Sequence, residues 1–210
     1  MDIFDAIANR TSIRRFKDQP VPDEDIKKIL DAARLAPSAN NTQPWCFLVI
    51  KDKMVLARMA DAVRQQVDKM IPFAESEKQA QRLVAYKSTY YTFFEKAPVV
   101  IAVFMEAYDA SSNQLLARMG YSAEEIARLR PNPGLQSVAA AIEHMLLAAH
   151  ALGYGSCWMT GPLVAQEEFE KLFGYGKDKF IAALLPVGVP DEKSSPKPRK
   201  KLNEIMKIIG

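Results

Sequence analysis

Cysteine and histidine are scarce in this sequence. Cys46 and Cys157 are its two cysteines, too few for a disulfide framework or a zinc-finger pattern, so we expect a reducing, cytoplasmic setting. Its two histidines, His144 and His150, lie six residues apart in a predicted helix and face different directions, which argues against a shared metal. The residues therefore favour neither a metal site nor a hydrolase built around a catalytic histidine.

Glycine-rich phosphate loops and long apolar runs are also missing. Gly153 and Gly155 follow a predicted helix instead of opening one, so neither a Walker loop nor a dinucleotide fingerprint is present. No apolar stretch is long enough to cross a bilayer, and the acidic first residues do not resemble a signal peptide. The net charge of +3 is too small to indicate nucleic acid or a membrane as a partner. We expect a soluble protein that binds neither.

What is present is enough apolar sequence for one domain of ordinary size, because 49% of the 210 residues are hydrophobic. Helical periodicity predicts helices over residues 3–9, 23–36, 56–67, 80–94, 133–152 and 165–173, and one more, opened by Ser122 and Glu125, within the irregular stretch 106–134. Short apolar runs predict strands over residues 46–51, 98–105, 155–159 and 180–189, and the first two are predicted to be buried. The irregular alternation favours an α+β domain over residues 1–210, with a C-terminal arm over residues 190–210.

Two basic segments stand near opposite ends of the chain. Arg10, Ser12 and Arg14 alternate, so their side chains can converge on one anion, and arginine with serine suits a phosphate. Lys197 and Arg199 flank a proline that stiffens the backbone. Taken singly, the first segment is better interpreted as a solvated turn and the second as a solubilising tail. Because no nucleophile or metal site accompanies them, together they suggest a bound cofactor that supplies the chemistry.

With two further motifs, these segments resemble the nitroreductase family of FMN-dependent oxidoreductases. The motifs are Pro-Ser-Ala-x-Asn-x-Gln-Pro-Trp from residue 37 and Leu-Gly-x-Gly-Ser-Cys-Trp-Met from residue 152. All four occur in the family's order and span nearly the whole chain. The resemblance implies a three-layer α/β/α sandwich with a central mixed, largely antiparallel sheet. It also implies an intertwined homodimer with an FMN at each interface.

The resemblance implies a role for each matching residue. Arg10, Ser12 and Arg199 would contact the phosphate, with Lys197 beside them, and Arg14 would lie near flavin N1 and the C2 carbonyl. The flavin would be walled from the other subunit by Pro37, Ser38, Ala39 and Asn41, with Gln43 nearby. Behind the ring would lie Met159, Thr160 and Gly161, the glycine admitting a flat ring close to the backbone. Relatives often add an asparagine and a lysine in the region that here reads Arg-Gln-Gln-Val-Asp-Lys over residues 64–69.

The function implied is a ping-pong oxidoreductase. NADH or NADPH would deliver hydride to flavin N5, and an electron-poor acceptor such as a nitroaromatic, a quinone or an activated alkene would then be reduced. The alternatives are a family branch that dehalogenates aromatics or consumes the flavin in oxygen chemistry, a flavin-binding sensor without turnover, and an interaction module without cofactor. An aromatic run could cap the flavin or belong to the core or dimer interface: Tyr86, Tyr90, Tyr91, Phe93 and Phe94. Candidates for an NADPH 2′-phosphate are Arg118, Arg128 and Arg130.

Overall fold

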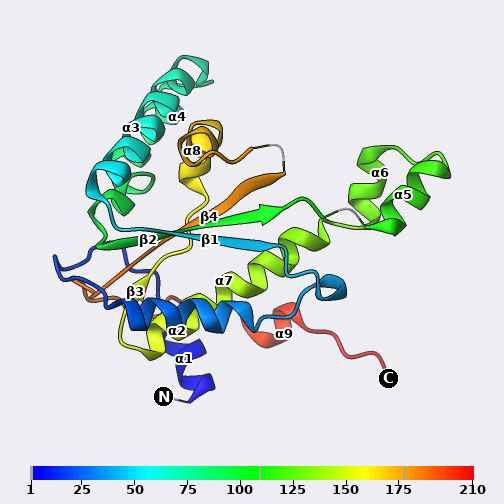
Figure 1. Cartoon of the computed structure of the whole chain (residues 1–210), viewed down its shortest axis with the longest axis horizontal. Coiled ribbons are helices and arrows are strands. Elements are labelled where there is room, and N and C mark those ends of the chain that lie inside the picture. The colour runs from blue at the N-terminus through cyan, green and yellow to red at the C-terminus, as the bar shows by residue number, and fades with distance from the viewer. Residues whose placement is uncertain (1, 109, 177) are drawn as a thin grey trace.

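The computed structural model describes residues 2–108, 110–176 and 178–210, which form three layers around one sheet (Figure 1). The sheet contains β1 (Trp45–Ile50), β2 (Val99–Glu106), β3 (Gly155–Ser156) and β4 (Lys179–Gly188), in the spatial order β1-β2-β4-β3. Its named strands pair antiparallel, and an isolated bridge between Ser12 and Ser156 adds a parallel contact. The predicted α+β sandwich with a largely antiparallel sheet is confirmed.

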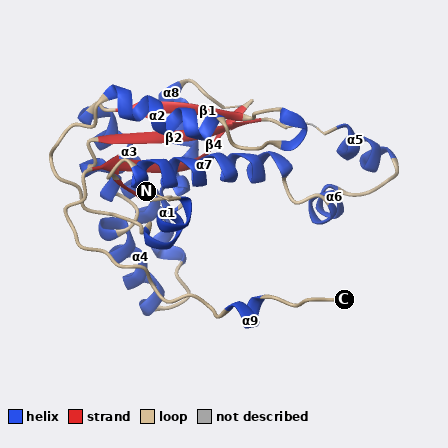
Figure 2. Ribbon diagram, turned by 90° about the horizontal axis from the view of Figure 1, so that it is seen from below, coloured by secondary structure: helices blue, strands red, loops and turns tan. Residues whose placement is uncertain are grey.

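The two faces of β2 explain the layers, because successive side chains of a strand point to opposite sides. Val99, Ile101 and Val103 pack against α2 (Asp23–Arg34) and α7 (Pro133–Ala151). Val100 and Phe104 face α3 (Lys53–Met70) and α8 (Gln166–Phe173). Figure 2 shows helices on both sides of the strands. A strand buried on both faces accounts for its uninterrupted apolar sequence.

Local sequence signals place the helix starts as predicted. The Asp2 carboxylate accepts a hydrogen bond from the Phe4 amide and caps α1 (Ile3–Asn9). Asn132 caps α7 by accepting from Leu135 N at 3.0 Å. Ser122 and Glu125 form a reciprocal capping box at α6 (Ala123–Leu129).

Three sequence predictions were wrong in part. The strand predicted over residues 155–159 covers only two residues, because the chain leaves the ladder and returns as an isolated bridge from Met159 to Leu184. Strand β1 was expected to be buried, yet only Ile50 is, because β1 lies at the edge of the sheet. The stretch 106–134 holds a second helix, α5 (Ser111–Arg118), whose first turn has no side-chain cap to announce it.

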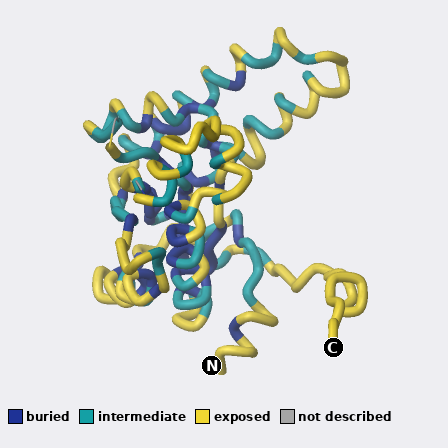
Figure 3. The backbone as a smooth tube through the Cα atoms, turned by 90° about the vertical axis from the view of Figure 1, so that its right-hand side faces the viewer, coloured by how far each residue is buried: buried dark blue, intermediate teal, exposed yellow. Residues whose placement is uncertain are grey.

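The remaining elements surround this frame. They are α4 (Glu77–Thr89), α9 (Leu202–Ile205) and the 3-10 turns η1 (Ala39–Asn41), η2 (Ile71–Phe73), η3 (Phe93–Lys96) and η4 (Gly161–Ala165). The hairpin of α5 and α6 projects beyond one end of the sheet (Figure 1), and the C-terminal arm stands away from the body (Figure 3). Among the described residues, no helix combines the length and apolar composition needed to cross a bilayer.

Candidate functional site

The two ends of the domain meet beside β3. The Ile13 amide donates to the Ser156 carbonyl at 3.0 Å, and the Lys17 amide donates to Val189 at 2.9 Å. This close approach depends on Gly155, since a Cβ there would lie 2.7 Å from Ile13 side-chain atoms. The N-terminal basic segment is thereby fixed between β3 and the exit of β4.

A cavity of about 140 Å³ opens where the two basic segments face each other. Its lining carries four cations and four hydroxyl groups: Arg10, Thr11, Ser12, Arg14, Ser194, Ser195, Pro196, Lys197 and Arg199. Since a water molecule takes about 30 Å³ of liquid, this volume suits one phosphate-sized group with a few waters. The structure thus gathers five residues named from the sequence, Arg10, Ser12, Arg14, Lys197 and Arg199, around one anion-sized space.

The Cys157 thiol lies next to this cavity but is not a nucleophile. Burial raises the pKa of Cys157, and the positive charge of Arg14 and a hydrogen bond with Ser12 offset part of that effect. The thiol is therefore neutral at physiological pH and acts as a small packing group. Cys46, by contrast, is half-buried, with its sulfur 3.9 Å from the Tyr175 hydroxyl.

Two tyrosines bridge the basic segment and the stretch Met159–Gly161. The Arg14 guanidinium lies over the Tyr90 ring, 5.7 Å from its centroid. Tyr91 packs against Gly161 so closely that a Cβ on the glycine would lie 2.5 Å from ring atoms. The flat ring that requires glycine at residue 161 within this chain is therefore that of Tyr91, a contact the sequence did not indicate.

The aromatic run divides between core and site. Phe94 is fully buried and Phe93 packs against the same core cluster. Tyr86 contacts both neighbouring tyrosines, with ring centroids 5.3 Å from Tyr90 and 5.8 Å from Tyr91. The phenylalanines and Tyr91 therefore pack against the core, and the three tyrosines form a wall that reaches the cationic cavity through the contact of Tyr90 with Arg14.

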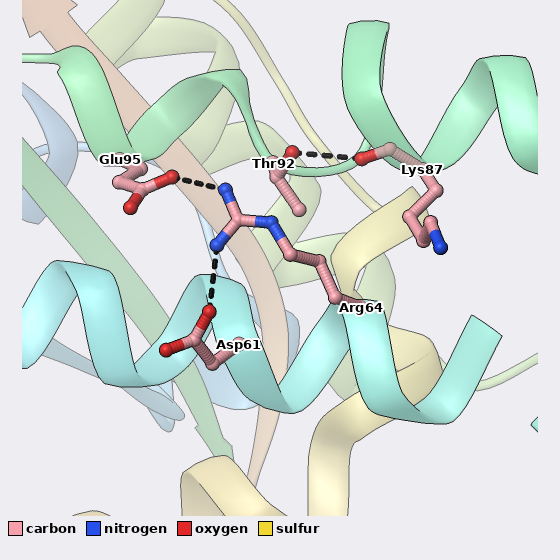
Figure 4. A network of polar contacts seen from close by, with 5 residues as sticks. All are labelled: Asp61, Arg64, Lys87, Thr92 and Glu95. Atoms are coloured by element: carbon pink, nitrogen blue, oxygen red, sulfur yellow. Dashed lines mark hydrogen bonds and ion pairs between the residues drawn. The ribbon is translucent and has the colours of Figure 1, made fainter. Parts of the chain in front are cut away.

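A polar network holds this wall in place (Figure 4). Arg64 on α3 donates to Asp61 at 2.8 Å and also to Glu95 of η3. The Thr92 hydroxyl donates to the Lys87 carbonyl at 2.7 Å and closes the turn that carries Tyr90 and Tyr91. Within the stretch 64–69, Arg64 is thus committed to this network, whereas Gln65, Gln66 and Lys69 line a separate cavity of about 610 Å³ against η4 and α8.

The loop over residues 37–43 lies away from the cationic cavity of its own chain. The Ala39 amide donates to the Ser137 hydroxyl at 3.1 Å, and Asn40 donates to the Tyr108 hydroxyl at 3.2 Å. Ser137 is in the first turns of α7, whereas the cationic cavity adjoins β3, beyond the last turn of that helix. At 1.5 Å per residue the two ends are roughly 20 Å apart. One chain therefore does not bring Pro37, Ser38, Ala39, Asn41 and Gln43 to the cavity.

The loop has a fixed shape of its own. Asn40, Asn41 and Gln43 have φ values of 53°, 54° and 48°, in the left-handed region that non-glycine residues adopt infrequently. The Gln43 amide donates to the Ser38 hydroxyl at 3.0 Å and stabilises this conformation. A strained, hydrogen-bonded loop presents its side chains in a defined arrangement.

The arginines considered for an NADPH 2′-phosphate lie on another part of the molecule. Arg118 and Arg128 are exposed on α5 and α6. Arg130 donates to the Asn113 side chain at 2.9 Å and lines a cavity between this hairpin and the end of the sheet. They do not converge with the basic residues of the cationic cavity.

Comparison with known proteins shows which family this chain belongs to. The model of the nitroreductase family matches residues 7–189. The chain belongs to the nitroreductase family. This confirms the resemblance drawn from the four motifs, and it makes the protein a nitroreductase-family oxidoreductase.

Individual relatives of this nitroreductase-family chain differ in what they are named for. A BluB-like flavoprotein from Clostridium difficile 630 is 36% identical, with a TM-score of 0.91 over 100% of both chains. A protein of Methanothermobacter thermautotrophicus, whose name pairs NADH dehydrogenase with NAD(P)H nitroreductase, is 30% identical over 91% of this chain and 79% of its own. A solved iodotyrosine deiodinase, bound to FMN and 3-iodo-L-tyrosine, is 26% identical with a TM-score of 0.75 over 100% of both chains. The relatives of this nitroreductase-family chain are thus named for more than one reaction.

Proposed function

We propose that this protein is an FMN-dependent oxidoreductase that passes hydride from NADH or NADPH to a small electron-poor acceptor. The observation that carries the proposal is the meeting of Arg10, Ser12 and Arg199 around one phosphate-sized cavity. Three of the cations, Arg10, Lys197 and Arg199, suit the single terminal phosphate of FMN, and the sequence has no dinucleotide fingerprint for the adenosine half of FAD.

The remaining residues fit the ring of the same cofactor. When bound, FMN accepts hydride at N5 and returns electrons to an acceptor. Arg14, held over the Tyr90 ring, supplies a fixed positive charge beside the pyrimidine edge, where negative charge accumulates on reduction. Lys197 adds a cation at the phosphate.

The stretch behind the ring offers backbone donors. The Met159 amide is committed to Leu184 at 2.9 Å. Thr160 and Gly161 open η4, and the first N–H groups of a helix have no acceptor within it. These two amides are available to address flavin N5 and O4.

A second copy of the chain closes the site in this proposal. The loop 37–43 lies roughly 20 Å from the cavity of its own chain, so Pro37, Ser38, Ala39, Asn41 and Gln43 reach a flavin only from another protomer. Helix α1 exposes Ile3, Phe4 and Ile7, beside an apolar cavity of about 340 Å³ shared with α7. Such a surface favours a homodimer partner. Light scattering at micromolar concentration tests this, and a monomer that still binds FMN tightly would overturn it.

The acceptor would be a nitroaromatic, a quinone or an activated alkene. Acceptor and nicotinamide share one exposed flavin face in this proposal, so ping-pong kinetics are expected. Reductive dehalogenation of an aromatic is the second candidate, and the similarity to an iodotyrosine deiodinase bound to 3-iodo-L-tyrosine favours it.

One anaerobic titration tests the proposal. The purified protein is expected to be yellow, to bleach when NADH or NADPH is added, and to regain colour with a nitroaromatic or quinone. Recovery with 3-iodotyrosine alone would favour dehalogenation. A protein that bleaches but reduces no acceptor would be a flavin-binding sensor, and a colourless protein that refuses FMN would refute flavin chemistry altogether.

A further inference from the structure

Glu192 joins the two ends of the domain. Its Oε1 accepts hydrogen bonds from two consecutive amides, those of Arg14 and Arg15, the second at 3.2 Å. Its Oε2 lies 3.6 Å from the Arg15 guanidinium. The Arg15 side chain is 73% exposed, so solvent screens this ion pair, and the bonds to the amides are the stronger contacts.

Glu192 is also the last anchored residue of the chain. Its side chain is 20% exposed, whereas residues 193–210 are all exposed. The adjacent backbone contact, from the Asp191 amide to the Arg15 carbonyl at 2.9 Å, ends the pairing between the two segments. Arg199 lies seven positions after Glu192, a span of up to about 24 Å when extended. The positions of Lys197 and Arg199 therefore depend on where Glu192 holds the arm.

The same contact shapes the N-terminal side of the cavity. Because the amides of Arg14 and Arg15 donate to Glu192, they are not available to an anion in the cavity, and their contribution to binding falls to side chains. The Arg14 backbone is fixed while its guanidinium remains free to reach over Tyr90.

We infer that Glu192 is a positioning residue that fastens the C-terminal arm to the N-terminal basic segment and so assembles the phosphate cavity from both ends of the chain. The inference rests on the proposed function insofar as the anion is the phosphate of FMN. Glu192 does not touch the ligand; it acts on phosphate binding through Lys197 and Arg199.

The test compares three variants in binding FMN and riboflavin, which lacks the phosphate, by quenching of flavin fluorescence. Glu192→Ala should weaken FMN binding about 10- to 100-fold, the scale of a lost charge-assisted hydrogen bond, and leave riboflavin affinity unchanged. Glu192→Gln keeps an acceptor oxygen and should stay within about threefold of wild type. Asp191→Ala is the matched control, because it removes the neighbouring charge from an exposed side chain and retains the backbone contact.

An unchanged FMN affinity in Glu192→Ala would overturn the inference, as would an equal loss for FMN and riboflavin. A purely structural role would lower the melting temperature without changing the ratio of the two affinities. Amide hydrogen exchange without flavin separates this inference from the proposed function. Exchange at the Arg14 and Arg15 amides should be faster in Glu192→Ala than in wild type, whether or not the protein binds FMN. Faster exchange together with a wild type that binds no FMN would refute the proposed function and leave the role of Glu192 standing. Equal exchange rates in Glu192→Ala and wild type would refute the positioning role of Glu192.

Discussion

The ring of Tyr91 lies directly against the backbone of Gly161, at a separation that leaves no room for a side chain on the glycine. Gly161→Ala should therefore displace the ring or the start of η4 and lower the free energy of unfolding by about 1–3 kcal/mol, the usual cost of overpacking. Urea denaturation measures this effect.

Gly176→Ala is the control for that substitution, because no atom lies within 4 Å of its added Cβ. It should change stability by less than about 0.5 kcal/mol. Combining Gly161→Ala with Tyr91→Leu should cost less than the sum of the two single changes, since the leucine yields space. Strict additivity would show that Tyr91 is not the obstacle.

Arg14 is expected to tune the cofactor more than to bind it. A cation beside the pyrimidine edge stabilises the reduced anion, so Arg14→Ala should lower the two-electron potential of bound FMN by about 30 mV or more, equivalent to a tenfold change in the equilibrium. Lys17→Ala removes the same charge from an exposed side chain nearby and should leave the potential unchanged. Spectroscopic potentiometry measures both, and equal potentials would remove the role assigned to Arg14.

Cys157 should react more slowly in the folded protein than an exposed cysteine does at the same pH. Burial raises the pKa of its thiol, so the folded protein keeps it protonated at pH values where an exposed cysteine has begun to ionise. A raised pKa also means that the folded state keeps the full contribution of the neutral thiol below the usual thiol pKa, and that stability falls as the pH rises from that value through the raised pKa of Cys157. In a Cys46→Ala background, alkylation by iodoacetamide should be slow at pH 8 and accelerate on unfolding in urea. Rapid alkylation of the folded protein at pH 7 would contradict this.

The network of Arg64 should be dominated by one of its two carboxylates. The Glu95 side chain is 27% exposed and the Asp61 side chain 63%, so solvent screens the Asp61 pair more strongly. A double-mutant cycle of Arg64→Met with Glu95→Gln should give a coupling near the upper end of the range for partly exposed pairs, about 1 kcal/mol. The cycle with Asp61→Asn should give less than half of that. The reverse order would show that Asp61 fixes the arginine.

The sequence predicted those parts of the fold that depend on neighbours along the chain. Asn132 and Pro133 mark the start of α7 because a cap and a first-turn proline act locally. The stripe of Ile26, Ile29 and Ala33 on α2 follows from helical periodicity alone. The continuous apolar run of β2 indicates a strand that is covered on both faces, without reference to any distant residue.

Only part of the candidate site could be predicted from neighbours along the chain. The motifs named five of the residues that line the cationic cavity, because each motif is contiguous, but they did not name Ser194 or Ser195. They did not reveal Glu192, whose bonds to the Arg14 and Arg15 amides span 178 and 177 residues, or the contact of Tyr91 with Gly161. The apolar run over residues 46–51 was predicted to be a buried strand, whereas β1 lies at the edge of the sheet, because an edge strand and a central strand can carry the same apolar residues. Long-range pairing leaves no local signature.

The account depends most on one phosphate being held by cations from both ends of the chain, and FMN and riboflavin titrations of Arg10→Ala, Arg199→Ala and wild type test this directly. Each substitution should weaken FMN binding by about 1.5–3 kcal/mol, roughly 10- to 150-fold, and leave riboflavin binding as it was. Wild-type protein that binds riboflavin as tightly as FMN, or an Arg199→Ala variant with unchanged FMN affinity, would contradict the account.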